Sequence, residues 1–451
     1  MKILMTGATG NVGNYVGRRL VELGHEVIVV SRSKEKALSY LEFPAEIVEH
    51  DFSLHPLPEK KFHGAEAIVH LMGETIDGRW TDKKKDLILK SRELGSEHLV
   101  KHLPASVKVI VSASAQGIYG DHKDHDVTEK SKLGSDFLAD VCKKWEAPFK
   151  NLDKAVRTVQ LRIGLVLDPQ SGVLRKMIPL FQRGFGGTLG SGDQYMSWIA
   201  IEDLTEVFVQ ALINDKYHGP INCSTDDPVT NNEWTKLLGK TLKAMPSPPV
   251  PSFALRIAIG EMAGAVLASI KMSPEILKNN HFKFKYPKLK EYFAQKLEPY
   301  KDGQYFYSVK QFVPREIEGV FKFFAEAANL EQITPPFLNF HVTKMSTKTI
   351  HEGTLIDYKL NLKGIPMKWK TLIKQWNPPH SFVDTQLSGP YRMWHHTHRF
   401  EKLGNGTLLS DEVRYKIPLG FLGQVMASTL VQKDVEKIFK FRREVIHKIK
   451  F

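Results

Sequence analysis

Residues 1–13, MKILMTGATGNVG, hold the pattern that decides the fold of the first half of this chain. The apolar run Met1–Met5 is expected of a buried parallel strand, and glycines follow at positions 7, 10 and 13. A strand of this kind turns tightly into a helix whose first free N–H groups face an anionic pyrophosphate. The first glycine permits the turn, the second lets the backbone approach the phosphates, and the third lets the helix pack against the strand. Because an amphipathic pattern over residues 15–23 follows, the stretch favours a dinucleotide site over a purely structural glycine turn.

The composition is that of an ordinary globular protein of two or three domains, with 451 residues, 42% of them apolar and 25% charged. The only cysteines, Cys142 and Cys223, form no disulfide framework and no metal-binding spacing, as expected of a reducing cytosol. The N-terminal apolar run is too short for a signal peptide, so a cytoplasmic location is expected. The stretch 253–270 is interrupted by Arg256 and Glu261, which favours a packed helix over a membrane span.

The net charge of +13 comes largely from dispersed lysines, with local density at residues 83–85, 281–290 and 433–450. No nucleic-acid motif accompanies this charge, so a solvated basic surface is favoured over a nucleic-acid site.

The first half alternates apolar runs with helical patterns. A long helix is expected over residues 83–103, and strands are expected over residues 25–30, 45–49, 67–71, 107–112 and 156–167. Strands separated by helices predict an α/β fold with a doubly wound parallel sheet of the Rossmann type. A ligand of such a sheet binds in the crevice at the carboxyl ends of the strands.

The end of the second expected strand indicates which nicotinamide cofactor is held. An acidic residue there would bind the ribose 2′-hydroxyl, whereas a basic residue would accept a 2′-phosphate. The chain has Ser31-Arg32-Ser33 and no carboxylate, which predicts NADP(H) rather than NAD(H), with Arg32 at the phosphate. The alternative is that Arg32 is an ordinary surface arginine.

The second half changes character after a proline-rich segment at residues 245–252 and a helical segment that extends to about residue 300. Helices are expected over 317–327 and 430–449, and β-alternation is seen over 304–312, 341–347, 354–362, 367–375, 381–387, 391–401 and 407–416. This order predicts an α+β module in which a long C-terminal helix covers an antiparallel sheet. We therefore place one domain at residues 1–300 and another at 303–451.

Residues 1–297 resemble the extended short-chain dehydrogenase/reductase superfamily, and within it the atypical epimerase family of YfcH-like proteins. The resemblance rests on the glycine motif, Leu71-Met-Gly-Glu74, Ser91-Arg92, Ser112-Ala-Ser-Ala115 and Phe137 to Glu146. It implies NADP(H) binding by Thr6, Gly7, Thr9, Gly10, Asn11, Val12, Gly13, Ser31, Arg32, Asp51, Leu71, Gly73, Glu74 and Ser91.

The chain departs from this superfamily at the usual Tyr-x-x-x-Lys pair, in which a lysine lowers the pKa of a tyrosine acid/base. Alignment on Glu146 puts Leu138 and Cys142 at those two positions, and an inert buried cysteine is favoured over a reactive thiolate. Ser114 matches the catalytic serine of the superfamily, and Tyr119 is a candidate substitute acid. A core or substrate-stacking role for this tyrosine stays open. The neighbouring Asp121–Asp126 loop holds two histidines but no fixed metal-ligand spacing, so no metal is expected there.

Residues 303–451 resemble the START-like fold of the polyketide cyclase/dehydrase and lipid-transport (SRPBCC) superfamily. The resemblance rests on Gly353-Thr354, Asp357-Tyr358, Gly389-Pro-Tyr391 and the run Trp394-His-His-Thr-His398. It implies a helix-grip domain whose cavity holds a hydrophobic ligand such as a lipid, polyketide or isoprenoid. In a strand His396 and His398 share one face and His395 points to the other. Two ligands without a locatable carboxylate are too few, so no metal is expected here either.

The leading hypothesis is a cytoplasmic NADP(H)-dependent oxidoreductase or epimerase-like enzyme fused to a hydrophobic-ligand domain. Hydride would move between the nicotinamide and a carbonyl or hydroxyl of a small-molecule substrate near Ser114 and Tyr119. One alternative is a non-catalytic NADP(H) sensor, which the residues at 138 and 142 suggest. Another is a lipid carrier whose basic charge engages a membrane surface. The substrate and the oligomeric state are left open.

Overall fold

The computed structural model describes residues 1–362, 364–418 and 420–449. The chain divides into two compact units, Met1–Lys34 with Ala45–Leu297, and Glu35–Pro44 with Glu298–Phe451. The change of unit after Leu297 lies close to the boundary expected from the sequence. The grouping of residues 35–44 with the second unit has no counterpart in the sequence pattern.

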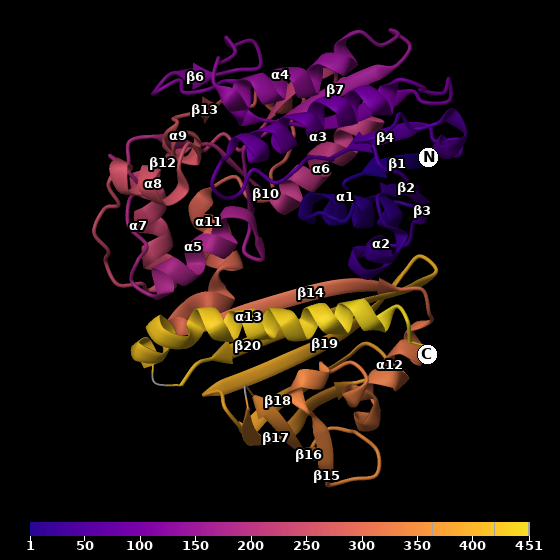
Figure 1. Cartoon of the computed structure of the whole chain (residues 1–451), viewed down its shortest axis with the longest axis vertical. Coiled ribbons are helices and arrows are strands. Elements are labelled where there is room, and N and C mark those ends of the chain that lie inside the picture. The colour runs from indigo at the N-terminus through magenta and orange to yellow at the C-terminus, as the bar shows by residue number, and fades with distance from the viewer. Residues whose placement is uncertain (363, 419, 450–451) are drawn as a thin grey trace. The chain divides into compact units, whose positions relative to one another are not determined.

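The first unit is built on a seven-stranded parallel sheet in the order β11-β7-β5-β4-β1-β2-β3. Its strands are β1 (Lys2–Thr6), β2 (Glu26–Ser31), β3 (Glu46–Glu49), β4 (Ala67–His70), β5 (Val109–Ala115), β7 (Arg157–Ile163) and β11 (Gly219–Cys223). Helix α1 (Asn11–Glu22) packs beside α6 (Ile201–Ile213), and α3 (Asp82–Val100) packs beside α4 (Phe137–Lys150), as Figure 1 shows. The order of strands reverses between β1 and β4, which makes the carboxyl ends of these two strands the expected ligand crevice.

The unit has further helices and strands outside the seven-stranded sheet. The helices are α5 (Gly172–Gln182), α7 (Asn231–Leu242), α8 (Ser252–Ile259), α9 (Met262–Leu267), α10 (Glu275–Asn279) and α11 (Leu289–Lys296). The strands are β6 (Asp126–Val127), β8 (Leu165–Asp168), β9 (Tyr195–Met196), β10 (Trp198–Ala200), β12 (Val229–Thr230) and β13 (Lys271–Met272).

Two expectations for this unit were wrong. The run 156–167 is two strands, because the chain leaves the main sheet at Gly164 and β8 pairs with β10. A side chain at Gly164 would meet the carbonyl oxygen of Ser197 at 2.8 Å. The run 253–270 is two short helices rather than one packed helix, and no residue of α8 is buried. No described helix is both long enough and apolar enough to cross a membrane.

The second unit is a seven-stranded antiparallel sheet in the order β14-β20-β19-β18-β17-β16-β15. Its strands are β14 (Tyr305–Val313), β15 (His341–Met345), β16 (Leu355–Leu362), β17 (Ile365–Asn377), β18 (Ser381–Ser388), β19 (Met393–Leu403) and β20 (Gly406–Lys416). The long helix α13 (Gly420–Ile446) runs along one side of this sheet, with α12 (Ile317–Phe324) near its C-terminal end (Figure 1). Most of α2 (Lys34–Tyr40) also belongs to this unit. The unit is the α+β helix-grip arrangement expected from the sequence, although α13 begins ten residues earlier than expected.

The core of the second unit is aromatic. Trp394, Tyr415 and Phe439 are buried in one cluster, against which Trp369 and Tyr391 pack. The indole of Trp369 lies edge-on to that of Trp394, with 5.4 Å between ring centroids. The packing of α13 on the sheet therefore depends on large side chains from β17, β19 and β20.

Candidate functional site

The glycine motif forms the turn between β1 and α1, and each glycine has a steric reason. Gly7 has a φ of +69°, and a Cβ at that position would lie 2.7 Å from the carbonyl oxygen of Leu71. A Cβ at Gly13 would lie 2.6 Å from the Cα of Ala8. Gly10 is exposed and precedes the first helical residue, Asn11. The first turn of α1 is thereby left open to an anion.

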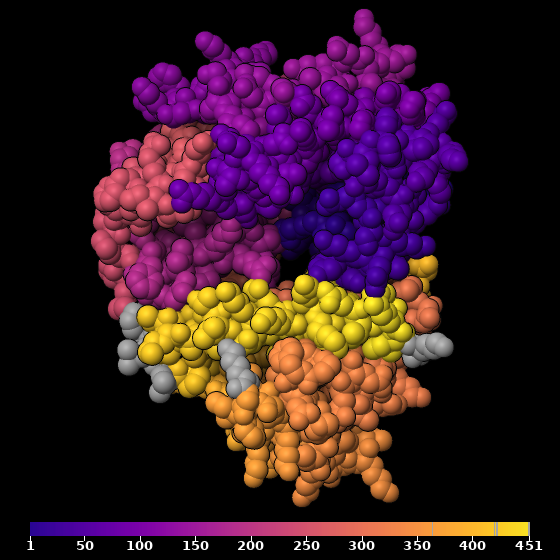
Figure 2. All heavy atoms as spheres, viewed as in Figure 1, coloured from indigo at the N-terminus to yellow at the C-terminus, as the bar shows by residue number. Residues whose placement is uncertain are grey.

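The other expected cofactor residues follow the carboxyl ends of the neighbouring strands. Ser31 ends β2 and Arg32 follows it, Asp51 lies shortly after β3, and Leu71, Gly73 and Glu74 follow β4. Figure 2 shows the first unit hollowed between its indigo N-terminal part and its magenta part. The sheet therefore brings these segments to one edge, although Ser31 and Glu74 lie 43 positions apart in the chain.

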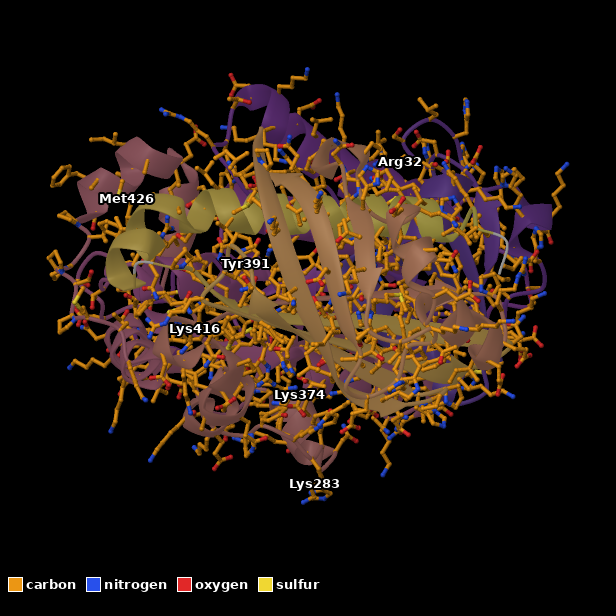
Figure 3. The ribbon with its side chains drawn as sticks, turned by 90° about the horizontal axis from the view of Figure 1, so that it is seen from below. Arg32, Lys283, Lys374, Tyr391, Lys416 and Met426 are labelled. Atoms are coloured by element: carbon orange, nitrogen blue, oxygen red, sulfur yellow. The ribbon has the colours of Figure 1, made fainter. Side chains whose placement is uncertain are left out.

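Arg32, labelled in Figure 3, is exposed at the end of β2. Asp51 is close enough to respond to its charge. Burial by itself would raise the pKa of Asp51, but hydrogen bonds from Ser53 and the positive charge of Arg32 bring that pKa below its usual value. Arg32 is thus an exposed cation beside one carboxylate at the end of β2.

The loop after β4 is held by two residues of α3. The hydroxyl of Ser91 accepts a hydrogen bond from the N–H of Glu74 (2.9 Å) and donates one to the carbonyl of Ile88 (3.1 Å). The guanidinium of Arg92 donates a hydrogen bond to the carbonyl of Glu74 (2.9 Å). A Cβ at Gly73 would lie 2.9 Å from Cζ of Arg92. These contacts assign Ser91 a role in positioning the loop.

A buried histidine joins the same loop to β1. His70 Nδ1 lies 2.9 Å from the hydroxyl of Thr6, and its Nε2 lies 3.2 Å from the hydroxyl of Ser96. Burial lowers the pKa of His70 to about 3, with a smaller contribution from the charge of Arg92. The imidazole is therefore neutral, and it donates a hydrogen bond to one of these hydroxyls and accepts one from the other.

Ser114, the first catalytic candidate, lies on β5 beside a buried ion pair. Its hydroxyl donates to Oε1 of Glu146 at 2.7 Å. Arg162 holds the same carboxylate with two hydrogen bonds of 3.0 Å, from Nε to Oε1 and from Nη2 to Oε2. Ser114 and Glu146 are each only 2% exposed. The serine hydroxyl thus has a fixed direction, with its proton toward the carboxylate.

Tyr119, the second candidate, is engaged on both sides. Its hydroxyl donates to Oδ1 of Asn222 at 2.6 Å and accepts a hydrogen bond from Nη1 of Arg162 at 3.0 Å. Burial raises the pKa of Tyr119 to about 12. A tyrosine that acts as an acid/base near neutral pH needs the opposite shift. The geometry therefore favours the core alternative for Tyr119.

The positions of the usual catalytic pair offer no replacement acid. Leu138 packs near Gly117, and Cys142 is buried on the same helix, α4. Burial raises the pKa of the Cys142 thiol to about 12, which favours the inert cysteine expected from the sequence.

Sequence reasoning missed the Glu146–Arg162 pair as the centre of this network. A signal was present, since Glu146 lies on the buried face of an amphipathic helix and Arg162 lies in the buried middle of a strand of the sheet. Charged residues at such positions are paired when they are buried.

Three family models match consecutive parts of the chain. The NAD dependent epimerase/dehydratase family matches residues 3–223, and a domain of unknown function, DUF1731, matches residues 250–295. The polyketide cyclase / dehydrase and lipid transport family matches residues 313–440.

Individual proteins resemble the first of these regions. The epimerase family protein SDR39U1 homolog of Arabidopsis thaliana is 38% identical over 301 residues, which cover 64% of this chain and 85% of the plant protein. The epimerase family protein YfhF of Bacillus subtilis is 31% identical and covers 65% of this chain and 97% of its own. The crystal structure of human SDR39U1 with NADPH is 28% identical, with a TM-score of 0.59, and covers 66% of this chain and 99% of the human one.

These matches fall on the unit that carries the glycine turn, while the C-terminal unit matches the lipid-transport model. The chain therefore belongs to the epimerase family and carries a polyketide cyclase/lipid-transport domain after its epimerase-like half.

Proposed function

We propose that the first unit binds NADP(H) at the carboxyl ends of β1, β2 and β4 and acts as an oxidoreductase or epimerase-like enzyme. The observation that carries this proposal is the glycine turn at β1, with Arg32 in place of a carboxylate at the end of β2. The NADPH in the human relative supports the same choice of cofactor. The pyrophosphate would lie at the start of α1 and the 2′-phosphate at Arg32.

Ser114 is a buried catalytic candidate whose hydroxyl oxygen keeps lone pairs for a substrate. Its proton points to Glu146, so its remaining lone pairs can accept a hydrogen bond from a substrate hydroxyl. Arg162 orients Glu146 through two hydrogen bonds, and the hydroxyl of Tyr119 accepts a hydrogen bond from Arg162. When bound, the nicotinamide would supply or accept the hydride. The protein's own contribution is to orient the hydroxyl or carbonyl carbon toward it.

The second unit would hold a hydrophobic ligand and keep it close to the chain. Ala427 and Val431 of α13 pack in the same cluster as Trp369 and Tyr391. Met426, labelled in Figure 3, is exposed beside them in the sequence, at 80%. Leu430, four positions further on the same helix, is 55% exposed, and the two side chains form an apolar surface suited to an apolar partner. Tethering such a ligand raises its local concentration for the first unit.

A non-catalytic NADP(H) sensor is the second candidate. It is favoured by Leu138 and Cys142 at the positions of the usual acid and lysine, and by the engaged hydroxyl of Tyr119. Such a protein would bind the cofactor tightly without oxidising it.

The cofactor assignment is tested by titrating the full chain with NADPH and with NADH and measuring each affinity from the fluorescence of the nucleotide. Arg32→Asp removes a charge-assisted contact worth about 1.5–3 kcal/mol, so NADPH affinity should fall by about 10- to 100-fold. Lys108→Asp is the matched control, because this exposed lysine lies at the amino end of β5, the opposite edge of the sheet. Equal affinity for the two nucleotides, or an unchanged NADPH affinity in Arg32→Asp, contradicts the proposal.

Native mass spectrometry of the purified chain separates the enzyme from the sensor. A co-purified apolar compound that drives NADPH oxidation supports the enzyme. Tight NADPH binding without turnover of any such compound supports the sensor.

A further inference from the structure

The antiparallel register of the second unit brings two carboxylates to the histidine run of β19. Asp384 on β18 lies opposite His396, and Asp411 on β20 lies opposite His398. The two histidines are two positions apart and therefore share a face of the sheet. The carboxylate partner that the sequence could not locate is thus supplied from both neighbouring strands.

The ring nitrogens of both histidines face carboxylate oxygens. His396 Nδ1 lies 3.4 Å and His398 Nε2 lies 3.2 Å from the same atom, Oδ2 of Asp384. On the other side, His396 Nε2 lies 2.9 Å and His398 Nδ1 lies 3.0 Å from Oδ1 of Asp411. His398 Nδ1 nevertheless makes no hydrogen bond.

Three of these atoms lie close together and face one another. Asp384 Oδ2, His396 Nδ1 and His398 Nε2 lie within 4.8 Å of one another. Imidazole nitrogens and a carboxylate oxygen at this spacing form a ligand set for a transition-metal ion. His398 Nε2 is within hydrogen-bond distance of Asp384 Oδ2 (3.2 Å), and an ion bound between the two groups would replace this contact.

The Asp411 side already has the form of a support for metal-binding histidines. A metal-bound imidazole commonly donates its other N–H to a carboxylate, which fixes the ring. His396 Nε2 makes that contact with Asp411, and Nη1 of Arg442 donates to the same Asp411 oxygen at 3.0 Å. Arg442 comes from α13, so the long helix anchors the carboxylate that orients the rings.

The surroundings keep water from the rings. His398 is stacked on Phe382 with 4.1 Å between centroids, and His396 meets the edge of Phe439 at 5.5 Å. His398 and Asp411 are buried, whereas Asp384 is half-buried and gives the site its contact with the outside. The aromatic side chains lower the local dielectric constant, which strengthens the attraction between the Asp384 carboxylate and a cation.

We propose that Asp384 Oδ2, His396 Nδ1 and His398 Nε2 bind one divalent transition-metal ion such as Zn²⁺, with Asp411 and Arg442 as positioning residues. In the described part of the chain, these three residues form the one group of His, Cys, Asp and Glu side chains whose ligand atoms lie within 4.8 Å of one another. Nitrogen and oxygen ligands of this kind suit Zn²⁺, Co²⁺ or Fe²⁺ rather than Ca²⁺ or Mg²⁺. Three protein ligands leave a fourth position for water or a ligand oxygen, as in catalytic rather than structural zinc sites.

The site is independent of the proposed cofactor chemistry, so it is tested by metal binding alone. The full chain is stripped with a chelator, exposed to Zn²⁺ or Co²⁺, dialysed and analysed for metal content. We expect one ion per chain, and X-ray absorption of the Zn²⁺ form should show two imidazoles and no sulfur. Less than half an equivalent of bound metal, or a spectrum without imidazole scattering, overturns the proposal.

Variants locate the ion. Asp384→Asn and His396→Gln should weaken binding at least about 100-fold, a larger loss than removal of an outer partner produces. His395→Gln is the matched control, since this histidine lies between the two proposed ligands but points to the opposite face of the sheet. Circular dichroism checks that each variant folds. If a ligand variant does not fold, the X-ray absorption of the unmodified chain still decides. Unchanged affinity in folded Asp384→Asn, or equal loss in His395→Gln, refutes the assignment.

Discussion

His70 makes the stability of the first unit depend on pH in a window that the structure defines. The ring is fully buried between Thr6 and Ser96, and its pKa falls from 6.5 to about 3. Between these values the unfolded chain binds a proton that the folded chain does not. Stability therefore rises with pH across this window and is lost as the pH falls below 6.5. Each pKa unit corresponds to about 1.36 kcal/mol, so a change from pH 7.5 to pH 5.0 removes about 2 kcal/mol.

The two cysteines provide an assay that reports on the first unit alone. Cys142 and Cys223 are both buried there, and the chain has no others. The protein is equilibrated in a urea series at each pH and given a short pulse of 4,4′-dithiodipyridine, which reacts with thiols at acidic pH. The labelled fraction gives the free energy of unfolding of this unit without interference from the second.

His70→Gln removes the titrating ring. It should reduce the difference in free energy of unfolding between pH 7.5 and pH 5.0 by about 2 kcal/mol, whatever the stability of the variant at pH 7.5. His125→Gln is the control, because this histidine is exposed and should leave the difference unchanged. If the unmodified chain and His70→Gln lose the same stability on acidification, His70 is not held neutral in the fold and the reasoning fails.

Two further substitutions test the glycine turn and the buried ion pair. Gly7→Ala should destabilise the first unit by more than the ~1–2 kcal/mol expected from its positive φ, because the new Cβ also meets the Leu71 carbonyl. Gly24→Ala is the control in the same thiol assay, because Gly24 has a φ of +80° but open space around its Cβ position. Equal losses of stability in the two variants would contradict the steric argument. Glu146→Gln should lower the free energy of unfolding by about 3–5 kcal/mol, because it leaves the charge of Arg162 buried and uncompensated. The double variant Glu146→Gln/Arg162→Met should recover part of this loss. Strictly additive losses of stability would mean that the two residues are not coupled.

Local features of the first unit could be predicted because the steric causes lie within a few residues. The role expected for Gly13 corresponds to its close approach to Ala8, five positions earlier, and the role expected for Gly7 corresponds to its φ of +69° in the turn. The break at Gly164 could not be predicted in the same way, since its cause is the carbonyl of Ser197, which belongs to another segment.

The candidate catalytic residues show the same division. Ser114 was found from its motif, but its partner Glu146 is 32 positions away and meets it only when α4 packs on the sheet. Tyr119 looked like an available acid because the sequence does not show that Asn222, 103 positions away, accepts its proton. Whether a hydroxyl is available for catalysis depends on hydrogen-bond partners far away in the chain, and the neighbouring residues in the sequence do not reveal them.

The sequence by itself determined the strand that ends in a glycine turn, the cation in place of a carboxylate at Arg32, and the shared face of His396 and His398. Each follows from a short-range rule: the steric limits of the backbone, the charge of one side chain, or the period of two in a strand. Only the tertiary structure decided that Asp384 and Asp411 flank the two histidines. Strand order and register set those neighbours, and both depend on how the whole sheet packs against α13.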